Sequence, residues 1–155
     1  MERLSIQPES GFSLIEILTV MAMVGIIVSM AIPRFGTTLA RQSVRGARNT
    51  IGTMQAKARA SAISRGRRTA FAIKGGRLAI LSPHPVTGTV DYVGRTIDTV
   101  TARYGVTLSI TPSTRDTLVF DARGLGTETS STTIIISKSG YADTITFAPL
   151  GRVLR

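Results

Sequence analysis

The sequence lacks cysteine and tryptophan entirely, and it contains a single histidine, His84. Without cysteine, the chain forms no disulfide and offers no thiolate as a nucleophile or as a metal ligand. One histidine alone does not make an ordinary zinc site, which takes several nitrogen or sulfur ligands. The sequence therefore predicts no metal site and no cofactor.

Groups suited to catalysis are equally scarce. His84 lies between two prolines, and neither Ser82 nor Asp91 stands in a pattern that fixes a Ser-His-Asp geometry. The glycine pair within residues 74–77 lacks the spacing of a phosphate-binding loop. The aspartates are scattered, and no pattern pairs them for acid–base chemistry or calcium binding. We predict that the protein is not an enzyme.

Acidic residues are few in comparison with basic ones. Nine Asp and Glu stand against nineteen Lys and Arg, which gives a formal net charge of +10. This excess predicts attraction to polyanions such as lipid headgroups, surface polysaccharide or nucleic acid.

One long apolar run dominates the N-terminal part of the chain. Residues 11–33 read GFSLIEILTVMAMVGIIVSMAIP, with Glu16 as the only charge. At about 1.5 Å per residue, a helix of this length just spans about 30 Å of hydrocarbon. The position fits a cleaved secretory signal, for which Ser29-Met30-Ala31 is an acceptable cleavage site, a permanent membrane span, or the apolar half of an assembly helix. A carboxylate in such a run favours its retention for a partner or a function, because burial in a bilayer is costly.

The stretch from Gly11 to Glu16, GFSLIE, resembles the processing site of type IV prepilins and type II secretion pseudopilins. The resemblance implies that a prepilin peptidase cuts after Gly11 and that Phe12 becomes the N-methylated first residue. Glu16 is then the fifth residue of the mature chain. A buried carboxylate needs a cationic partner, and the amine of a neighbouring subunit would be one.

The same resemblance implies a location. Residues 12–33 would lie in inner-membrane lipid, as the single span of a bacterial inner-membrane protein whose C-terminal domain is periplasmic. The leader, residues 1–11, carries one arginine and two glutamates, so its removal raises the net charge from +10 to +11. A leader this weakly basic departs from the family norm.

A helical pattern continues past Pro33 to about Ser64. Proline removes one backbone donor, so we expect a kink near Pro33 and not an end. Gly46 and Gly52 weaken the helix locally. Apolar residues recur at the three- and four-residue spacing of one helix face: Ala40, Val44, Ala47, Ile51, Met54, Ala58 and Ala62.

A second stripe on this helix is basic. Its members are Arg34, Arg41, Arg45, Arg48 and Arg59. We interpret the stripe mainly as a solvated flank, because charge runs usually are. The alternatives are acidic neighbours in a filament and, for Arg34, lipid headgroups.

The remainder of the chain alternates short β-rich runs with turns. Two β-hairpins are predicted, over residues 69–81 and 132–147, with turns at Gly75-Gly76 and Ser139-Gly140. Further strands are predicted over 106–110 and 116–122. Two prolines place residues 82–85 in a loop.

These elements predict an α+β fold, in which a long N-terminal α-helix with a membrane-embedded apolar half leads into a β-rich globular domain of antiparallel strands. The expected parts are a leader (1–11), a transmembrane and assembly helix (12–33), its amphipathic continuation (34–64) and the globular domain (65–155).

Two C-terminal stretches carry a second resemblance. Residues 120–124, FDARG, and 147–152, FAPLGR, are similar to signatures of the GspH/FimT family of minor pseudopilins and pilins. This family comprises the H-type minor subunit of type II secretion and its type IV pilus relatives. The resemblance implies a structural minor subunit of a type II secretion pseudopilus, which assembles with other pseudopilins and supports protein secretion.

The alternative function is that of a FimT-like type IV minor pilin that binds DNA for uptake in natural transformation. FimT-like proteins are associated with DNA uptake through a C-terminal Gly-Arg-x-Arg element, from which residues 151–155 depart by one extra residue. The candidate DNA or polyanion ligands are Arg123, Arg152 and Arg155. The tyrosines are spread along the chain, so no platform for base stacking is predicted.

Overall fold

The computed structural model of the chain describes residues 12–83, 88–113 and 116–154. The chain separates into two compact units, Met1–Gly36 and Thr37–Arg155, and each is described by itself. The first unit contains the N-terminal part of helix α1 (Leu14–Arg65), and the second contains the rest of α1 and all the strands described below.

Helix α1 is continuous through Pro33, as predicted, and the kink there stays a prediction. The helix ends one residue beyond the predicted boundary. Gly66 takes a φ of 58°. Its amide donates to the carbonyl of Ile63 at 3.2 Å, and the amide of Arg67 donates to the carbonyl of Ala62 at 3.1 Å. This pair of bonds is a Schellman motif, which satisfies the last carbonyls of the helix and turns the chain into the first strand.

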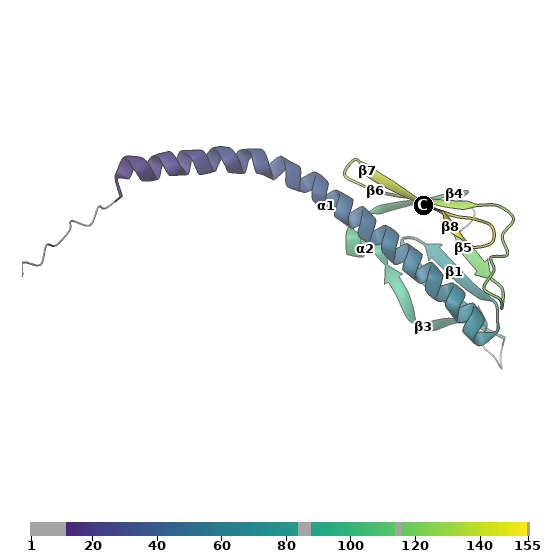
Figure 1. Cartoon of the computed structure of the whole chain (residues 1–155). Coiled ribbons are helices and arrows are strands. Elements are labelled where there is room, and N and C mark those ends of the chain that lie inside the picture. The colour runs from purple at the N-terminus through teal and green to yellow at the C-terminus, as the bar shows by residue number, and fades with distance from the viewer. Residues whose placement is uncertain (1–11, 84–87, 114–115, 155) are drawn as a thin grey trace, which may run out of the picture. The chain divides into compact units, whose positions relative to one another are not determined.

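Two antiparallel four-stranded sheets follow the helix (Figure 1). One sheet has the order β3-β2-β1-β5, and the other has the order β4-β6-β7-β8. A short helix, α2 (Val100–Tyr104), lies between β3 and β4 in the chain. The strands are β1 (Thr69–Lys74), β2 (Arg77–Pro83), β3 (Val90–Thr99), β4 (Thr107–Thr111), β5 (Thr117–Phe120), β6 (Thr132–Lys138), β7 (Tyr141–Phe147) and β8 (Val153–Leu154).

Both predicted hairpins are confirmed. Gly75-Gly76 joins β1 to β2, and Ser139-Gly140 joins β6 to β7. All four turn residues take a positive φ, between 48° and 80°. Two-residue turns with positive φ at both positions match the right-handed twist of the strands, and glycine adopts this conformation most easily.

The predicted apolar face of α1 is confirmed as the centre of the core. All seven residues named for it are buried, none more than 6% exposed. From Val44 onward they pack in one cluster with large side chains from both sheets, including Phe71, Phe120 and Phe147. Figure 1 shows this part of α1 lying along the sheets.

The prediction of a loop over residues 82–85 is wrong for its first half. Ser82 and Pro83 end β2, where they pair with Asp91 and Val90 of β3. Proline is tolerated there because the last residue of a strand has little need of its missing N–H. His84 lies outside the described residues.

Three elements were not predicted. The stretch that follows Thr89 forms β3 and α2, and the C-terminal tail contains β8, which pairs with Thr146 and Phe147 of β7. A strand of two residues has no periodicity of its own, so only its partner strand reveals it.

We expect Ile51→Ala to destabilise the fragment of residues 37–155 by about 2–5 kcal/mol, because it leaves a cavity in the core. Ile51 is fully buried, and every buried hydrophobic residue of the described chain lies between Ala40 and Phe147, within this fragment. Urea unfolding measures the change. Leu39→Ala is the matched control, since Leu39 is 60% exposed on the same helix. Equal losses for the two variants would contradict the placement of the core.

Candidate functional site

Phe12 and Glu16, the predicted processing and assembly residues, lie close together at the start of the chain's long helix. Phe12 is 81% exposed, and Glu16 is exposed as well. Both line one shallow surface hollow of about 330 Å³, together with Ile17, Val20 and Met21. Among the described residues, no cationic side chain pairs with the Glu16 carboxylate. Gly11 lies outside the described part of the chain.

The N-terminal half of α1 is apolar on all sides. The large hydrophobic side chains of residues 14–30 are between 48% and 77% exposed. The hydroxyls of Thr19 and Ser29 donate to the carbonyls of Ile15 and Ile26 within the helix, each at 2.8 Å. By length and hydropathy, no helix within the described residues qualifies as a membrane span.

The two C-terminal stretches singled out in the sequence lie together and form what we call the loop joint, made of residues 121–126, residues 148–152 and Gln55. The amide of Gly126 donates to the carbonyl of Leu150 at 3.0 Å, which ties one loop to the other. Gln55 of α1, only 3% exposed, donates its side-chain amide to the carbonyl of Gly151 at 2.8 Å. The joint therefore fastens both loops to each other and to the helix.

Two glycines permit this close approach. A Cβ on Gly126 would meet the carbonyl oxygen of Pro149, and a Cβ on Gly151 would lie 2.6 Å from the ring of Phe120. Gly151 also takes a φ of 79°, a conformation that favours glycine. Gly151, in the second family-like stretch, and Gly126, two residues after the first, thus have a packing role.

The Asp121 carboxylate holds the first loop of the joint. It accepts hydrogen bonds from the amides of Leu125 at 2.8 Å and Arg123 at 2.9 Å, and from the Arg123 side chain at 3.2 Å. The Leu125 amide, and after it the Arg123 groups, lower the pKa of Asp121 below its ordinary value, although desolvation acts the other way. The loop therefore favours the charged carboxylate.

Two of the three predicted polyanion-binding arginines belong to the loop joint. Arg123 has a side chain that is 81% exposed, with its Nε beside Asp121. Arg152 is exposed and directly precedes β8. Arg155 lies outside the residues that the structure describes. The binding role of all three stays a prediction.

The basic stripe of α1 makes contacts that the sequence analysis missed. The Arg41 guanidinium lies 5.5 Å from the centre of the Tyr141 ring, and Arg48 forms an ion pair with Asp143 at 3.1 Å. The interpretation as a solvated flank is therefore wrong for Arg48, which is partly buried, whereas Arg41 is exposed beside the ring. Arg45 and Arg59 are exposed, and the side chain of Arg34 is not described.

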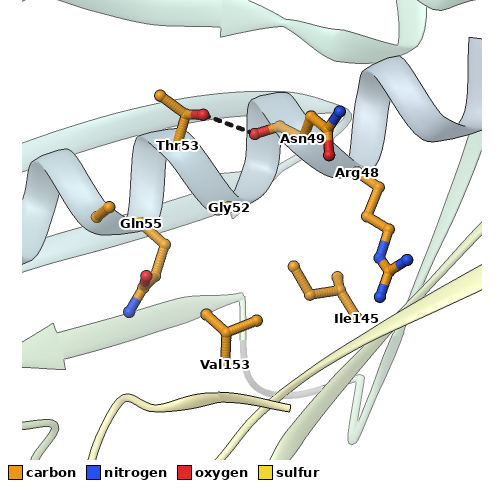
Figure 2. Close-up of a pocket in the computed structure, with 8 residues that line it drawn as sticks. Arg48, Asn49, Gly52, Thr53, Gln55, Ile145 and Val153 are labelled. Carbon is orange, nitrogen blue, oxygen red and sulfur yellow. Dashed lines mark hydrogen bonds between the residues drawn. The ribbon is translucent and has the colours of Figure 1, made fainter. Parts of the chain in front are cut away.

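A groove of about 840 Å³ lies between this flank of α1 and the strands β7 and β8. We call it the α1–β7 groove. Figure 2 shows α1 along one side and the side chains of Ile145 and Val153 on the other. Its lining residues are Arg48, Asn49, Gly52, Thr53, Gln55 and Ala56 from α1, with Ile145 and Val153 from the strands.

Within the described ranges, no three His, Cys, Asp or Glu side chains gather into a group that would hold a metal ion. The two aspartates at the features above, Asp121 and Asp143, each pair with an arginine. Their roles in this fold are structural.

We expect Asp121→Asn to lower stability at about pH 7 and to have a smaller effect at about pH 3. The lowered pKa means that the native carboxylate adds stability above its unfolded pKa of about 3.9, and that this stability is lost as the pH falls through the folded pKa. Chemical unfolding of both proteins across this range gives the difference. A difference independent of pH would contradict the assigned role of the charge.

Two family models match the sequence. The model described as type II transport protein GspH matches residues 47–151, and the model of the prokaryotic N-terminal methylation motif matches residues 7–32. No curated protein matches the sequence.

Among solved structures, the chain is similar to the type IV minor pilin FimU of Pseudomonas aeruginosa strain PAO1. The P21 crystal form is 19% identical with a TM-score of 0.59, over 74% of this chain and 88% of FimU. The P65 crystal form is 18% identical with a TM-score of 0.53, over 71% and 90%. At such identity the similarity establishes the fold, and the predicted α+β arrangement of a long helix followed by antiparallel sheets is confirmed.

The GspH match extends from the amphipathic part of α1 to the second loop of the joint, which is more than half of the chain. The methylation motif covers nearly all of the apolar run, including Phe12 and Glu16. The chain therefore belongs to the GspH family of minor pseudopilins and pilins, and it carries the N-terminal methylation motif of pilin-like proteins.

Proposed function

We propose that this chain is a structural minor subunit of a type II secretion pseudopilus. The observation that carries the proposal is a helix with apolar side chains exposed on all sides over residues 14–30 and a single acid, Glu16, one turn after Phe12. A helix of this kind requires cover from lipid or from other helices. After cleavage behind Gly11 by a prepilin peptidase, the helices of other pseudopilins would pack against these side chains.

Before assembly, the N-terminal helix is held in the bacterial inner membrane, with the C-terminal domain in the periplasm. The methylation motif supports this arrangement. The internal hydrogen bonds of Thr19 and Ser29 support it too, because hydrocarbon offers no partner to a free hydroxyl.

Glu16 has its role at assembly. Its carboxylate lies in an apolar hollow beside Phe12 and lacks a cationic partner among the described residues. Inside a bundle of helices, a buried carboxylate without a cationic partner is strongly unfavourable. The N-terminal amine of a neighbouring subunit would neutralise it. The pair would thus favour one register of the helix against its neighbour.

We expect Glu16→Gln to be processed normally but to enter filaments far less than the wild-type chain, because the amide keeps the size of the side chain and removes its charge. The mass of the mature chain reports cleavage, and the amount of protein in sheared filaments reports assembly. Normal incorporation would contradict the pairing.

Gly11→Val is the control for the cleavage step, because it should block processing itself. A bulky residue before the cut should block the peptidase, so the variant should keep the mass of the uncleaved chain. A mature mass equal to that of the wild type would contradict the requirement for a small residue before the cut.

A second function, DNA binding by a FimT-like type IV minor pilin, is favoured by the two exposed arginines of the loop joint. Arg123 and Arg152 lie on loops tied by the Gly126–Leu150 bond, in a chain with a net charge of +10. Phosphate contacts from such side chains supply most non-specific affinity for DNA.

If this function is correct, an Arg152→Ala/Arg155→Ala double variant should bind duplex DNA more weakly. Each lost phosphate contact should also reduce the salt slope of log K by about 0.9. Arg45→Ala/Arg65→Ala removes the same charge from exposed positions on α1 and is the matched control. Equal loss in both variants would mean that the attraction is generic, and the secretion subunit would stand alone.

A further inference from the structure

The outer edge of β7 is only partly covered. Along its inner edge, β6 pairs with every residue of β7 from Tyr141 to Phe147. Along its outer edge, β8 pairs only with Thr146 and Phe147. The outer edge over residues 141–145 therefore lacks a strand partner among the described residues.

Strand alternation identifies the backbone groups that face outward there. Lys138 and Tyr141 flank a two-residue turn, so their backbone groups bond to each other across the hairpin. Two residues on, Asp143 repeats this orientation, and Ala142 and Thr144 therefore point their N–H and C=O groups away from β6. The Thr144 amide accordingly donates to the Asp143 carboxylate at 2.8 Å and not to another strand.

The α1–β7 groove lies beside this edge, and Gly52 widens it. A Cβ on Gly52 would come no closer than 3.9 Å to any side chain, that of Ile145. The fold has room for alanine at this position, although glycine inside a helix costs about 1 kcal/mol relative to alanine. Packing of the domain does not explain this glycine. It leaves an open space whose apolar walls are Ala56, Ile145 and Val153.

The charge around the groove selects for an acidic occupant. Arg48 lines it, and Arg45 and Arg41 lie about one and two turns earlier on the same helix. Asp143 is the acid that faces Arg48. In an added strand, side chains two residues apart point to the same side. One apolar side chain would enter the space at Gly52 while an acid two residues away approaches Arg48.

We propose that the α1–β7 groove binds an extended acidic segment of a partner protein, which adds as a strand to the outer edge of β7 at Ala142 and Thr144. Main-chain hydrogen bonds would provide affinity, and the Gly52 space with Arg48 would provide specificity. The inference is separate from the proposed pseudopilus function, since it concerns a different surface and needs no filament.

Asp143 protects this edge of β7 from pairing with other strands. Its carboxylate binds both the Thr144 amide and Arg48, the two groups that an acidic strand would use. Proteins commonly protect exposed strand edges with charge, because an open edge pairs with any strand. An incoming segment must displace Asp143 from the Thr144 amide, so removal of the carboxylate should strengthen binding.

The test uses the full chain in detergent with a short capped peptide. The peptide is mostly threonine, with a valine and a glutamate two positions apart, and it carries a fluorophore for anisotropy titration. Hydrogen–deuterium exchange locates the bound peptide. We expect saturable binding and slower exchange over residues 141–146. The same peptide with lysine in place of glutamate should bind at least about tenfold more weakly, a difference of about 1.4 kcal/mol.

Three variants test the site itself. Gly52→Leu fills the space and should weaken binding about tenfold or more, whereas Ala60→Leu, at an exposed position of α1 outside the groove, should leave it unchanged. Asp143→Ala should bind the peptide more tightly. Thermal unfolding of each variant shows whether the domain remains folded.

Three results would overturn the proposal. The first is absence of binding up to about 1 mM peptide, the weak end of measurable affinity. The second is protection of β4, the other edge strand of the same sheet, in place of residues 141–146. The third is binding in folded Gly52→Leu that equals binding in Ala60→Leu.

Discussion

The packing of one face of α1 against both sheets is the contact on which the domain depends. Two four-stranded sheets of short strands each have a buried face, and α1 packs against both. The helix contributes small residues such as Ala47 and Ala58, while the strands contribute large ones such as Phe71 and Phe147. This division lets the sheets approach the helix closely. The loop joint and the α1–β7 groove are consequences, because Gln55 and Gly52 are direct neighbours of the buried Met54 and Ile51.

The same helix serves two environments. Over residues 14–30 large apolar side chains are exposed on all sides, and after residue 37 only one face is apolar. A single uninterrupted helix thus combines a segment that requires lipid or other helices with a segment that completes a folded domain. This is the physical basis for a subunit that can fold before it assembles, since the core of the domain makes no use of the apolar segment.

The arginines show how little net charge alone reveals. Arg41 lies against an aromatic ring, Arg48 pairs with an aspartate on β7, and Arg123 is held partly by Asp121. Partly exposed pairs of this kind contribute modestly to stability, but they orient the strands and loops that they join. The net charge of +10 already subtracts the paired aspartates, so these contacts decide where the positive charge lies and not how large it is.

The sequence by itself determined the local features: the seven buried positions of α1, both two-residue turns, and a processing motif whose family was confirmed. These follow from the spacing of side chains along a helix and from the backbone freedom of glycine, which neighbouring residues largely decide. Only the tertiary structure decided that β8 exists, that Arg48 meets Asp143, and that the stretches around Gly126 and Gly151 form one joint. Each of these joins residues far apart in the chain, and no local pattern encodes which distant partner a strand edge, a charge or a loop will meet.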